Sequence, residues 1–199
     1  NLGQKLMKNE IDNVQWIKKN IITENIEQKA DLVISSYVLN EVKREEKNKI
    51  LEKLWNATEK LLLIIEPGTP EGYSQIREMR EYLLEIGANI VAPCAHEEKC
   101  KIEENDWCAF SCRVARTKVH KLLKEGDAPY EDEKFSYIAV SKIKTEKEAR
   151  ILRHPKIENG KITLKLCTED GNIEEKIITK KQKERFKIAK KLSCGDILK

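Results

Sequence analysis

The alternation of short apolar runs with amphipathic segments is the feature that most restricts how this chain can fold. Residues 30–36 and 60–66 are compact apolar runs, typical of strands buried on both faces. Residues 43–59 and 74–86 repeat apolar side chains at helical spacing, and residues 89–92 form a third strand-like run. The order strand, helix, strand, helix, strand predicts an α/β fold with a parallel, doubly wound sheet and right-handed crossovers.

The middle of the chain interrupts this alternation. Residues 93–112 lose the hydrophobic period and gather cysteines, which predicts a loop organised by something other than an apolar core. Residues 116–124 are predicted to be helical. Residues 135–140 alternate like a strand, and we expect them to form a last antiparallel edge strand of the same sheet.

The two ends of the chain carry further elements. Two alternating runs, residues 161–167 and 173–179, flank the turn signal Glu-Asp-Gly-Asn and predict a β-hairpin, followed by a basic helix over residues 180–191. Near the start, a helix over residues 6–19 is expected to lead into an extended stretch over residues 16–22. The predicted parts are an α/β part whose front half is absent (1–92), a cysteine-rich insertion with a helix (93–125), a last strand (126–145) and a small basic β module (146–199).

Charge is divided unevenly along the chain. The net charge is +4, but residues 1–112 carry 15 Lys and Arg against 20 Asp and Glu, whereas residues 113–199 carry 23 against 14. A basic half predicts contact with a polyanion, because phosphates release condensed counterions when cations bind them. The alternative is a solvated surface rich in lysine and glutamate.

The sequence also indicates a compartment. No apolar run approaches the roughly 20 residues of a spanning helix, and the first residues have neither a basic segment nor a cleavage site, so we expect a cytoplasmic protein without membrane contact. The first residue is not methionine, so a fragment or a processed product is one interpretation. In that case an N-terminal segment or another chain would complete the fold.

The cysteines are the strongest chemical signal. Four of the six fall within residues 94–112 in the pattern C-x5-C-x7-C-x3-C, and Cys167 and Cys194 follow. Because disulfides are rare inside cells, metal ligation is the better explanation. Structural zinc sites usually show close C-x2-C or C-x4-C pairs, which are missing here, whereas wider spacings suit an iron–sulfur cluster.

Other interpretations of the cysteines stay open. A zinc site could use Cys94, Cys100 and Cys108 with His96 or Cys112, and reduced cysteines without a ligand are a third interpretation. Cys112 could instead enter the core as a small apolar residue. Cys194 is expected to be a free thiol.

Three motifs carry a family resemblance. Pro-Cys-Ala-His at residues 93–96, Asp-Trp-Cys-Ala-Phe-Ser at 106–111 and Pro-Tyr-Glu-Asp-Glu-Lys-Phe-Ser-Tyr at 129–137 resemble the methyltransferase-like family associated with the mitochondrial small ribosomal subunit, which has bacterial and archaeal members. The resemblance covers about residues 30–196. It implies a Rossmann-like class I fold that binds S-adenosylmethionine, and a role in the assembly or methylation of small-subunit rRNA.

The resemblance also implies ligands. It assigns a 4Fe-4S cluster to Cys94, Cys100, Cys108 and Cys167. The C-terminal Cys-Gly-Asp departs from the bulky residue that the family commonly has before Gly-Asp, which argues against Cys194 as a required ligand. We expect the cluster to join the α/β sheet to the basic β module.

The cofactor site is less complete. No glycine-rich turn follows a first strand, so the candidate cofactor-binding residues are those at two strand ends. They are Ser35, Ser36, Tyr37, Asn40 and Glu66. A helix start at Asn40 and a strand end at Glu66 are the structural alternatives.

No catalytic base or nucleophile is evident, so the enzymatic activity stays open between an rRNA methyltransferase, a catalytically silent rRNA-binding assembly factor and a zinc-containing RNA-binding module. The candidate RNA-binding residues are basic side chains of the C-terminal half. They are Arg113, Arg116, Lys118, Lys121, Lys180, Lys181, Lys187 and Lys190.

Overall fold

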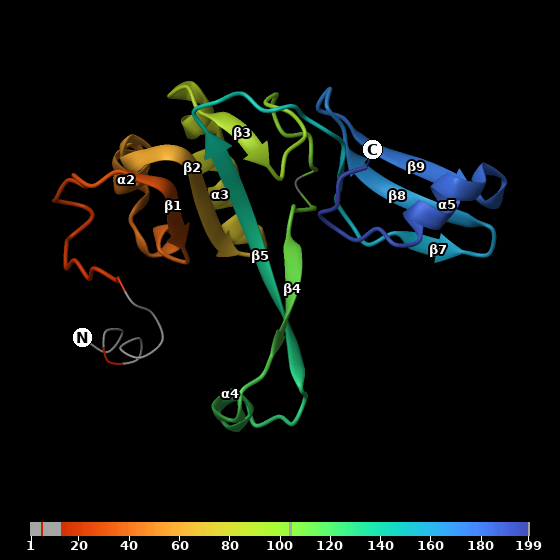
Figure 1. Ribbon diagram of the computed structural model, residues 1–199, viewed down its shortest axis with the longest axis horizontal. Helices are drawn as coiled ribbons and strands as arrows, with labels where there is room; N and C mark the ends of the chain where they lie inside the picture. Colours follow the sequence, from red (N-terminus) through yellow and green to blue (C-terminus); the bar gives the residue numbers. More distant parts are fainter. Residues whose placement is uncertain (1–4, 6–12, 104, 199) are drawn as a thin grey trace.

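The computed structural model describes residues 5, 13–103 and 105–198 and contains two β-sheets. Figure 1 shows the larger sheet at the centre, a narrow arm that projects from it, and a smaller sheet beside it that is built from the C-terminal residues. The predicted combination of a mixed α/β part with a small C-terminal β module is confirmed.

The larger sheet has the order β1-β2-β5-β3, with β4 pairing β5. Strands β1 (Ala30–Ser36) and β2 (Thr58–Pro67) are parallel, as the crossover through α2 (Arg44–Ala57) requires. Strand β5 (Tyr130–Ser141) runs antiparallel to both β2 and β3 (Asn89–Ala92). Two helices therefore connect strands that enter the sheet in the same direction.

The predicted edge position of residues 135–140 is wrong, because β5 lies between β2 and β3. Ile138 and Val140 are fully buried on the face that the helices cover, and Ala139 is buried on the opposite face. Burial on both faces is what an internal strand requires. A short run of alternating residues does not distinguish this position from an edge.

The main core lies between one face of the larger sheet and helices α2 and α3 (Pro70–Glu85). The apolar stripes of both helices, including Leu51 and Leu83, meet Leu62 and Ile64 of β2 there, all fully buried. At the start of α3, the Thr69 hydroxyl accepts a hydrogen bond from the backbone of Gly72. A Cβ on Gly72 would lie 2.0 Å from the Pro67 carbonyl oxygen, so this turn requires glycine.

The predicted loop over residues 93–112 ends earlier than expected, because β4 (Phe110–Ala115) begins at Phe110 and pairs with β5. Together with α4 (Lys118–Leu123), these strands form the arm in Figure 1. Cys112 lies exposed on β4, so its predicted alternative place in the core is wrong. Phe110, its neighbour two positions earlier, is the residue of β4 that is buried.

The smaller sheet confirms the predicted hairpin, because β8 (Lys161–Cys167) pairs antiparallel with β9 (Ile173–Thr179). Strands β6 (Arg150–Ile151) and β7 (Lys156–Glu158) also pair with β8. The 3-10 helix η2 (Lys180–Gln182) and α5 (Lys183–Ala189) take the place of the predicted basic helix. Phe186 of α5 packs on the sheet with Ile162 and Leu164 to form a second core.

Part of the predicted N-terminal helix, residues 6–12, lies outside the described residues. Residues 13–19 are described and are not helical. In the part of the chain that the structure covers, no helix combines the length and the apolar character needed to cross a bilayer.

Candidate metal centre

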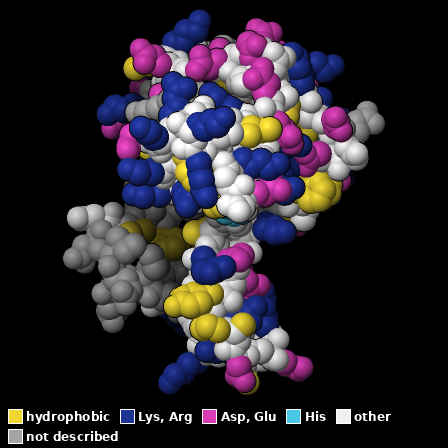
Figure 2. Space-filling view, turned by 90° about the vertical axis from the view of Figure 1, so that its right-hand side faces the viewer, with side chains coloured by type: hydrophobic (Ala, Val, Ile, Leu, Met, Phe, Trp, Pro, Cys, Tyr) yellow, Lys and Arg dark blue, Asp and Glu magenta, His cyan; other side chains and the backbone are white. Residues whose placement is uncertain are grey.

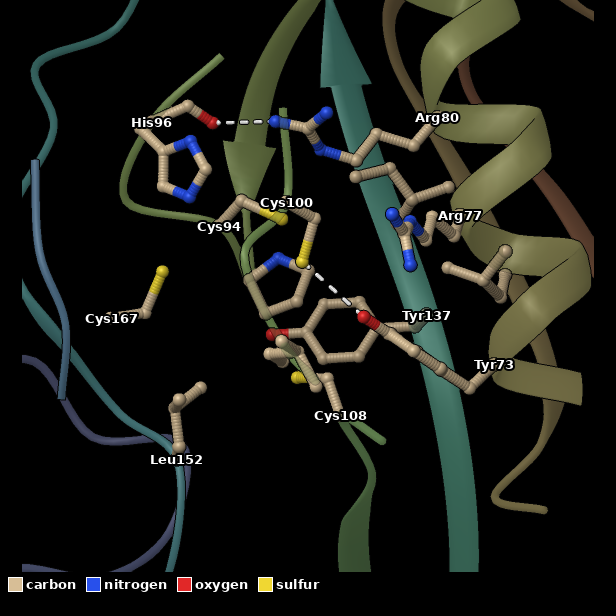
Figure 3. Close-up of a pocket in the computed structure, with 14 residues that line it drawn as sticks. Tyr73, Arg77, Arg80, Cys94, His96, Cys100, Cys108, Tyr137, Leu152 and Cys167 are labelled. Atoms are coloured by element: carbon tan, nitrogen blue, oxygen red, sulfur yellow. Dashed lines mark hydrogen bonds between the residues drawn. The ribbon is translucent and has the colours of Figure 1, made fainter. Parts of the chain in front are cut away.

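Cys94, Cys100, Cys108 and Cys167 line one cavity where the two sheets meet. Cys94 follows β3, Cys100 and Cys108 belong to the loop that leads to β4, and Cys167 ends β8. Figure 3 shows their sulfur atoms around a common space, with Cys167 reaching it from the C-terminal side. The structure thus brings together the four cysteines that the resemblance assigns as ligands.

The surroundings of the cavity are mainly apolar. Ile102 and Leu152 approach it from the two modules, and Ala95, Leu152 and Cys167 form a small buried cluster of their own. Cys167 is buried, and the other three cysteines of the cavity are partly buried. Such a wall excludes water from most of the site.

Burial also controls the protonation of these thiols. It raises the pKa of Cys94 and of Cys108, for Cys108 well above the ordinary value, and raises that of Cys167 to about 11. The negative charge of neighbouring cysteines acts in the same direction, since each would have to ionise next to the others. Without a metal the thiols of Cys94, Cys108 and Cys167 therefore keep their protons, and a bound metal displaces these protons.

A buried arginine lies beside the cysteines. Arg80 of α3 is 3% exposed, and its Nη2 donates to the carbonyl oxygens of His96 (3.1 Å) and Glu98 (2.8 Å). Its Nε has no hydrogen-bond partner among the described residues, and none of their carboxylates forms an ion pair with it. Arg80 also acts on the pKa of Cys94, opposing the effect of burial. A buried cation without a counter-ion favours an anionic group in the cavity.

A phenol contacts one of the sulfurs. The hydroxyl of Tyr73, one turn into α3, lies 3.3 Å from the sulfur of Cys100 (Figure 3). Burial is the main cause that raises the pKa of Tyr73, so the phenol keeps its proton. Against a metal-bound thiolate, Tyr73 is therefore the hydrogen-bond donor.

The sulfurs do not gather as closely as the ligands of one small ion. A zinc ion with Zn–S bonds of about 2.3 Å holds four sulfurs about 3.8 Å apart. Within the described part of the chain, ligand atoms of three residues come within 4.8 Å of one another at His120, Glu131 and Glu133, but not at the cysteines. That group on the arm is not a good metal site, because Glu131 already pairs with Arg116 and Lys124.

Polar contacts hold the two modules together around the cavity. The carboxylate of Asp106 pairs with Arg153 and, at 2.9 Å, with Lys165 of β8. Arg150 donates to the Pro93 carbonyl oxygen at 3.0 Å. These contacts fix the loop that carries three of the cysteines against the strand that carries the fourth.

Comparison with known proteins identifies the family of this chain. The family described as "Mitochondrial small ribosomal subunit Rsm22" matches residues 1–199. The chain belongs to the Rsm22 family. The resemblance that the three motifs carry is thereby confirmed at the level of the family.

Relatives of the Rsm22-family chain are longer. A human protein, "Ribosome assembly protein METTL17, mitochondrial", is 25% identical over 187 residues, which cover 84% of this chain and 39% of the human protein. Two proteins of Schizosaccharomyces pombe, "Rsm22-cox11 tandem protein" 1 and 2, both mitochondrial, are 27% identical over 217 residues, covering 83% of this chain and 28% of each relative. The chain thus spans well under half the length of these relatives.

The other candidate ligands of this family member occupy different places. His96 lines the cavity, and burial, followed by the charge of Arg80, lowers its pKa. Its Nδ1 has no hydrogen-bond partner among the described residues, so the ring is compatible with a mixed ligand set. The thiol of Cys194 instead donates to the Leu152 carbonyl oxygen at 3.2 Å, and Cys112 lies on the arm.

The candidate cofactor residues gather at the ends of β1 and β2. Glu66 is fully buried, and its Oε1 accepts a hydrogen bond from the backbone N–H of Leu39 at 3.0 Å. Leu39 begins a 3-10 helix, η1 (Leu39–Glu41), which also contains Asn40. Ser35 is buried, whereas Ser36 and Tyr37 are exposed. Glu66 thus holds the turn after β1 in place. This role agrees with the alternative interpretation of Glu66 as a structural residue at the end of a strand.

Substituting Glu66 by glutamine is expected to stabilise the protein above neutral pH. Burial is the main cause that raises the pKa of Glu66, so the folded state prefers the protonated side chain. Wild-type stability therefore falls as pH rises from the ordinary glutamate range through this raised pKa. The variant keeps an acceptor for Leu39 and does not ionise. We expect its Tm to exceed that of the wild type by about 2–4 °C at pH 8 and the difference to shrink at pH 4.5. Thermal unfolding at both pH values measures this, and a constant difference would contradict it.

The candidate RNA-binding residues form two groups. Arg113, Arg116, Lys118 and Lys121 lie on the arm, and Lys180, Lys181, Lys187 and Lys190 lie on or beside η2 and α5. Figure 2 looks onto the C-terminal module and shows many Lys and Arg side chains there, mixed with acidic ones. Arg113 and Arg116 are paired with Asp132 and Glu131, which leaves them less available to phosphates.

Sequence reasoning did not identify Tyr73 and Arg80. With Arg77 they repeat at i, i+4 and i+7, so they share one side of α3 and all line the cavity. Arginines on the side of an amphipathic helix that faces a sheet are unusual. Their helical spacing in the sequence was therefore the signal that could have identified Arg80.

Proposed function

We propose that this chain is the metal-binding part of an assembly factor of the small ribosomal subunit, with an iron–sulfur cluster held by Cys94, Cys100, Cys108 and Cys167. The observation that carries the proposal is the convergence of four cysteines from two modules on one apolar cavity. When bound, the cluster would make three bonds to the cysteine loop and one to Cys167, and would thereby link the loop to the smaller sheet. The chain's own groups would orient the ligands and keep water out.

Two features of the site bear on the choice between a cluster and the alternatives. Arg80 offers a buried positive charge without a carboxylate partner in the described part of the chain, which suits the net negative charge of any metal centre with four thiolates and disfavours free thiols. Among the described residues no three of these sulfurs lie within 4.8 Å of one another, which favours the wider ligand spacing of a cluster over that of one zinc ion. Free thiols would leave the charge of Arg80 without compensation.

Metal and sulfide analysis of protein purified without oxygen tests the proposal. We expect about four irons and four acid-labile sulfides per chain and a brown colour. A colourless protein with one zinc and no sulfide would favour the alternative of a zinc-containing RNA-binding module. A protein with neither metal would exclude both.

The ribosomal part of the proposal is supported by the family and by charge. The human relative is described as a ribosome assembly protein, and the family as belonging to the mitochondrial small ribosomal subunit. The segment 180–191 has seven Lys and Arg and one acidic residue. Such a segment favours rRNA phosphates, and binding that weakens steeply with salt is the expected signature.

A second candidate concerns activity. An S-adenosylmethionine-dependent rRNA methyltransferase would use the ends of β1 and β2, but Glu66 is buried and already bonded to Leu39. This observation favours a catalytically silent rRNA-binding factor that uses the fold as a scaffold. Calorimetry with S-adenosylmethionine on the full-length protein distinguishes them, since rRNA binding without cofactor binding supports the scaffold.

Substituting Tyr73 by phenylalanine is expected to lower the reduction potential of the centre. Removing a hydrogen bond to the sulfur of Cys100 leaves the thiolate richer in electrons, which favours the oxidised state. A bond worth about 1 kcal/mol corresponds to about 40 mV for a one-electron couple. Potentiometric titration measures the shift, with Tyr82→Phe as the control, because Tyr82 also lies on α3 but its hydroxyl donates to Glu52 and it does not line the cavity. An unchanged potential would contradict this role.

A further inference from the structure

A second pocket lies where the arm joins the body, beside the smaller sheet. Its walls come from the cysteine loop, from β4 and β5 at the base of the arm, and from the segments that follow β6 and α5. Trp107, Phe110, Lys134, Arg153 and His154 are among its lining residues, and no residue of this lining also lines the cysteine cavity. Its volume of about 310 Å³ is near the lower limit for ligand pockets, which suits a ligand the size of one nucleotide.

Trp107 gives this pocket an aromatic wall. Its indole N–H donates to the Gly68 carbonyl oxygen at 3.1 Å, and its own carbonyl oxygen accepts a hydrogen bond from Arg153 at 2.9 Å. Both bonds hold the residue in place, yet Trp107 remains 36% exposed. An aromatic ring that is fixed at its polar end and open to solvent is a preorganised surface for stacking.

Two other lining residues offer hydrogen-bond donors to an anion. Lys134 of β5 and His154, which follows β6, are exposed, and neither forms an ion pair with another described residue. An ammonium group has three N–H donors, and an imidazole ring has at least one. Phosphate oxygens in the pocket can therefore accept hydrogen bonds from both side chains.

Acidic side chains close to the pocket do not cancel these donors. Asp106, the acidic residue of the lining, is already shared by two cations. Asp132 forms a bidentate pair with Arg113, at 2.8 and 3.0 Å. Glu133 adjoins Lys134 in the sequence, but successive side chains of a strand point to opposite faces, so Glu133 points away from the pocket.

An aromatic wall next to phosphate donors favours single-stranded RNA. Proteins hold single strands by stacking unpaired bases on aromatic rings and by contacting the backbone with cations. The bases of helical RNA are paired and stacked on one another, so helical RNA is held by contacts to phosphates and 2′-hydroxyls and does not use an aromatic wall.

We propose that this pocket binds one nucleotide of a single-stranded stretch of rRNA, with the base against Trp107 and a phosphate at Lys134 and His154. The inference rests on the proposed rRNA binding and deepens it, because it names the form of the RNA and a contact outside residues 180–191. Every base has a face that can stack, so little preference for the identity of the base is expected.

Fluorescence anisotropy with a labelled single-stranded oligouridine and full-length protein purified without oxygen tests the inference. Trp107→Leu is expected to bind about tenfold more weakly or worse, whereas Trp107→Phe keeps a ring for stacking and should bind within about threefold of the wild type. The matched control, Trp16→Leu, removes an exposed tryptophan outside the pocket and should bind like the wild type.

A lysine variant tests the phosphate contact at a position away from the cysteines. Lys134→Ala is expected to weaken binding about threefold or more and to reduce the slope of log affinity against log salt by about 0.7, the contribution of one phosphate on a single strand. Lys144→Ala, an exposed lysine beyond the other end of β5, is the matched control and should stay within about twofold of the wild type. Because Trp107 adjoins Cys108, the iron content and the Tm of every variant are measured as well.

The form of the RNA provides the remaining arms of the test. An RNA duplex of the same length should lose no more than about twofold in affinity with Trp107→Leu, and an equal loss for duplex and single strand would overturn the inference. An abasic strand that binds the wild type as tightly as oligouridine would also overturn it. Unchanged affinity for oligouridine in both Trp107→Leu and Lys134→Ala overturns it while leaving the proposed function intact. A wild type that binds neither form of RNA overturns the inference and the proposed rRNA binding together.

Discussion

Replacing Cys167 by serine is expected to abolish the visible absorbance of the centre and to lower the free energy of unfolding by about 3 kcal/mol or more. Cys167 is the ligand candidate from the smaller sheet, and the backbone N–H of Ala95, in the cysteine loop, favours its thiolate. Losing it removes the connection between the modules as well as one iron ligand. Iron and sulfide content with anaerobic denaturant unfolding measure both effects.

Two other cysteines provide controls for this variant. Cys112→Ser changes an exposed residue of the arm, and Cys194→Ser changes a thiol that donates to the Leu152 carbonyl oxygen and does not itself line the cavity. Both variants should retain iron and sulfide. A Cys167→Ser protein with full cluster content, or loss of the cluster in Cys194→Ser, would contradict the proposed ligand set.

Replacing Arg80 by methionine is expected to lower stability by about 2–4 kcal/mol and to reduce the cluster content. The substitution leaves the carbonyl oxygens of the buried His96 and of Glu98 without their donor. It also removes the cation beside Cys94, and this cation lowers the pKa of the thiol. Without it, Cys94 forms the metal-binding thiolate less readily. Denaturant unfolding and metal analysis of the same preparations measure the two effects.

Two further variants separate charge from position. Arg80→Lys keeps the charge but cannot reach both carbonyl oxygens in the same way, so partial recovery of cluster content is expected. Arg77→Met lies on the same helix, and its ion pair with Glu81 is long at 3.8 Å, so an effect below about 1 kcal/mol is expected. Full stability and full cluster content in Arg80→Met would rule out this role for the arginine.

The fold could be predicted where burial leaves a pattern in the sequence. Strand β2 and helices α2 and α3 supply most of the core, so their apolar periods survive and the predicted ranges agree closely with the structure. The predicted range of β1 is also right, but its predicted burial on both faces is wrong, because Leu32 and Ile34 are 49% and 55% exposed. Strand β4 has a single buried residue, Phe110, and its pairing with β5 is stabilised by ion pairs on the arm. A strand surrounded by solvent has no apolar period, so it was predicted as a loop.

The site was predictable in its ligands but not in its surroundings. The cysteines are rare enough for their spacing and motifs to be informative, and the structure brings Cys167 to the other three. Tyr73 and Arg80 are ordinary residues of an amphipathic helix until the fold shows what they face. The burial of Glu66 likewise depends on the turn at Leu39, which sequence periodicity does not reveal.

The central position of β5 determines when the cysteine loop can form during folding. Strand β3 pairs with β5 through Asn89↔Ser141, about fifty positions apart, and β4 pairs with the same strand. Contacts between distant residues form slowly, since the closure of long loops costs entropy. We therefore expect residues 93–109 to stay an open loop until β5 inserts next to β2. Substitutions that delay this insertion, for example at Ile138, should prolong the period in which the thiols of the loop react with an alkylating reagent during refolding.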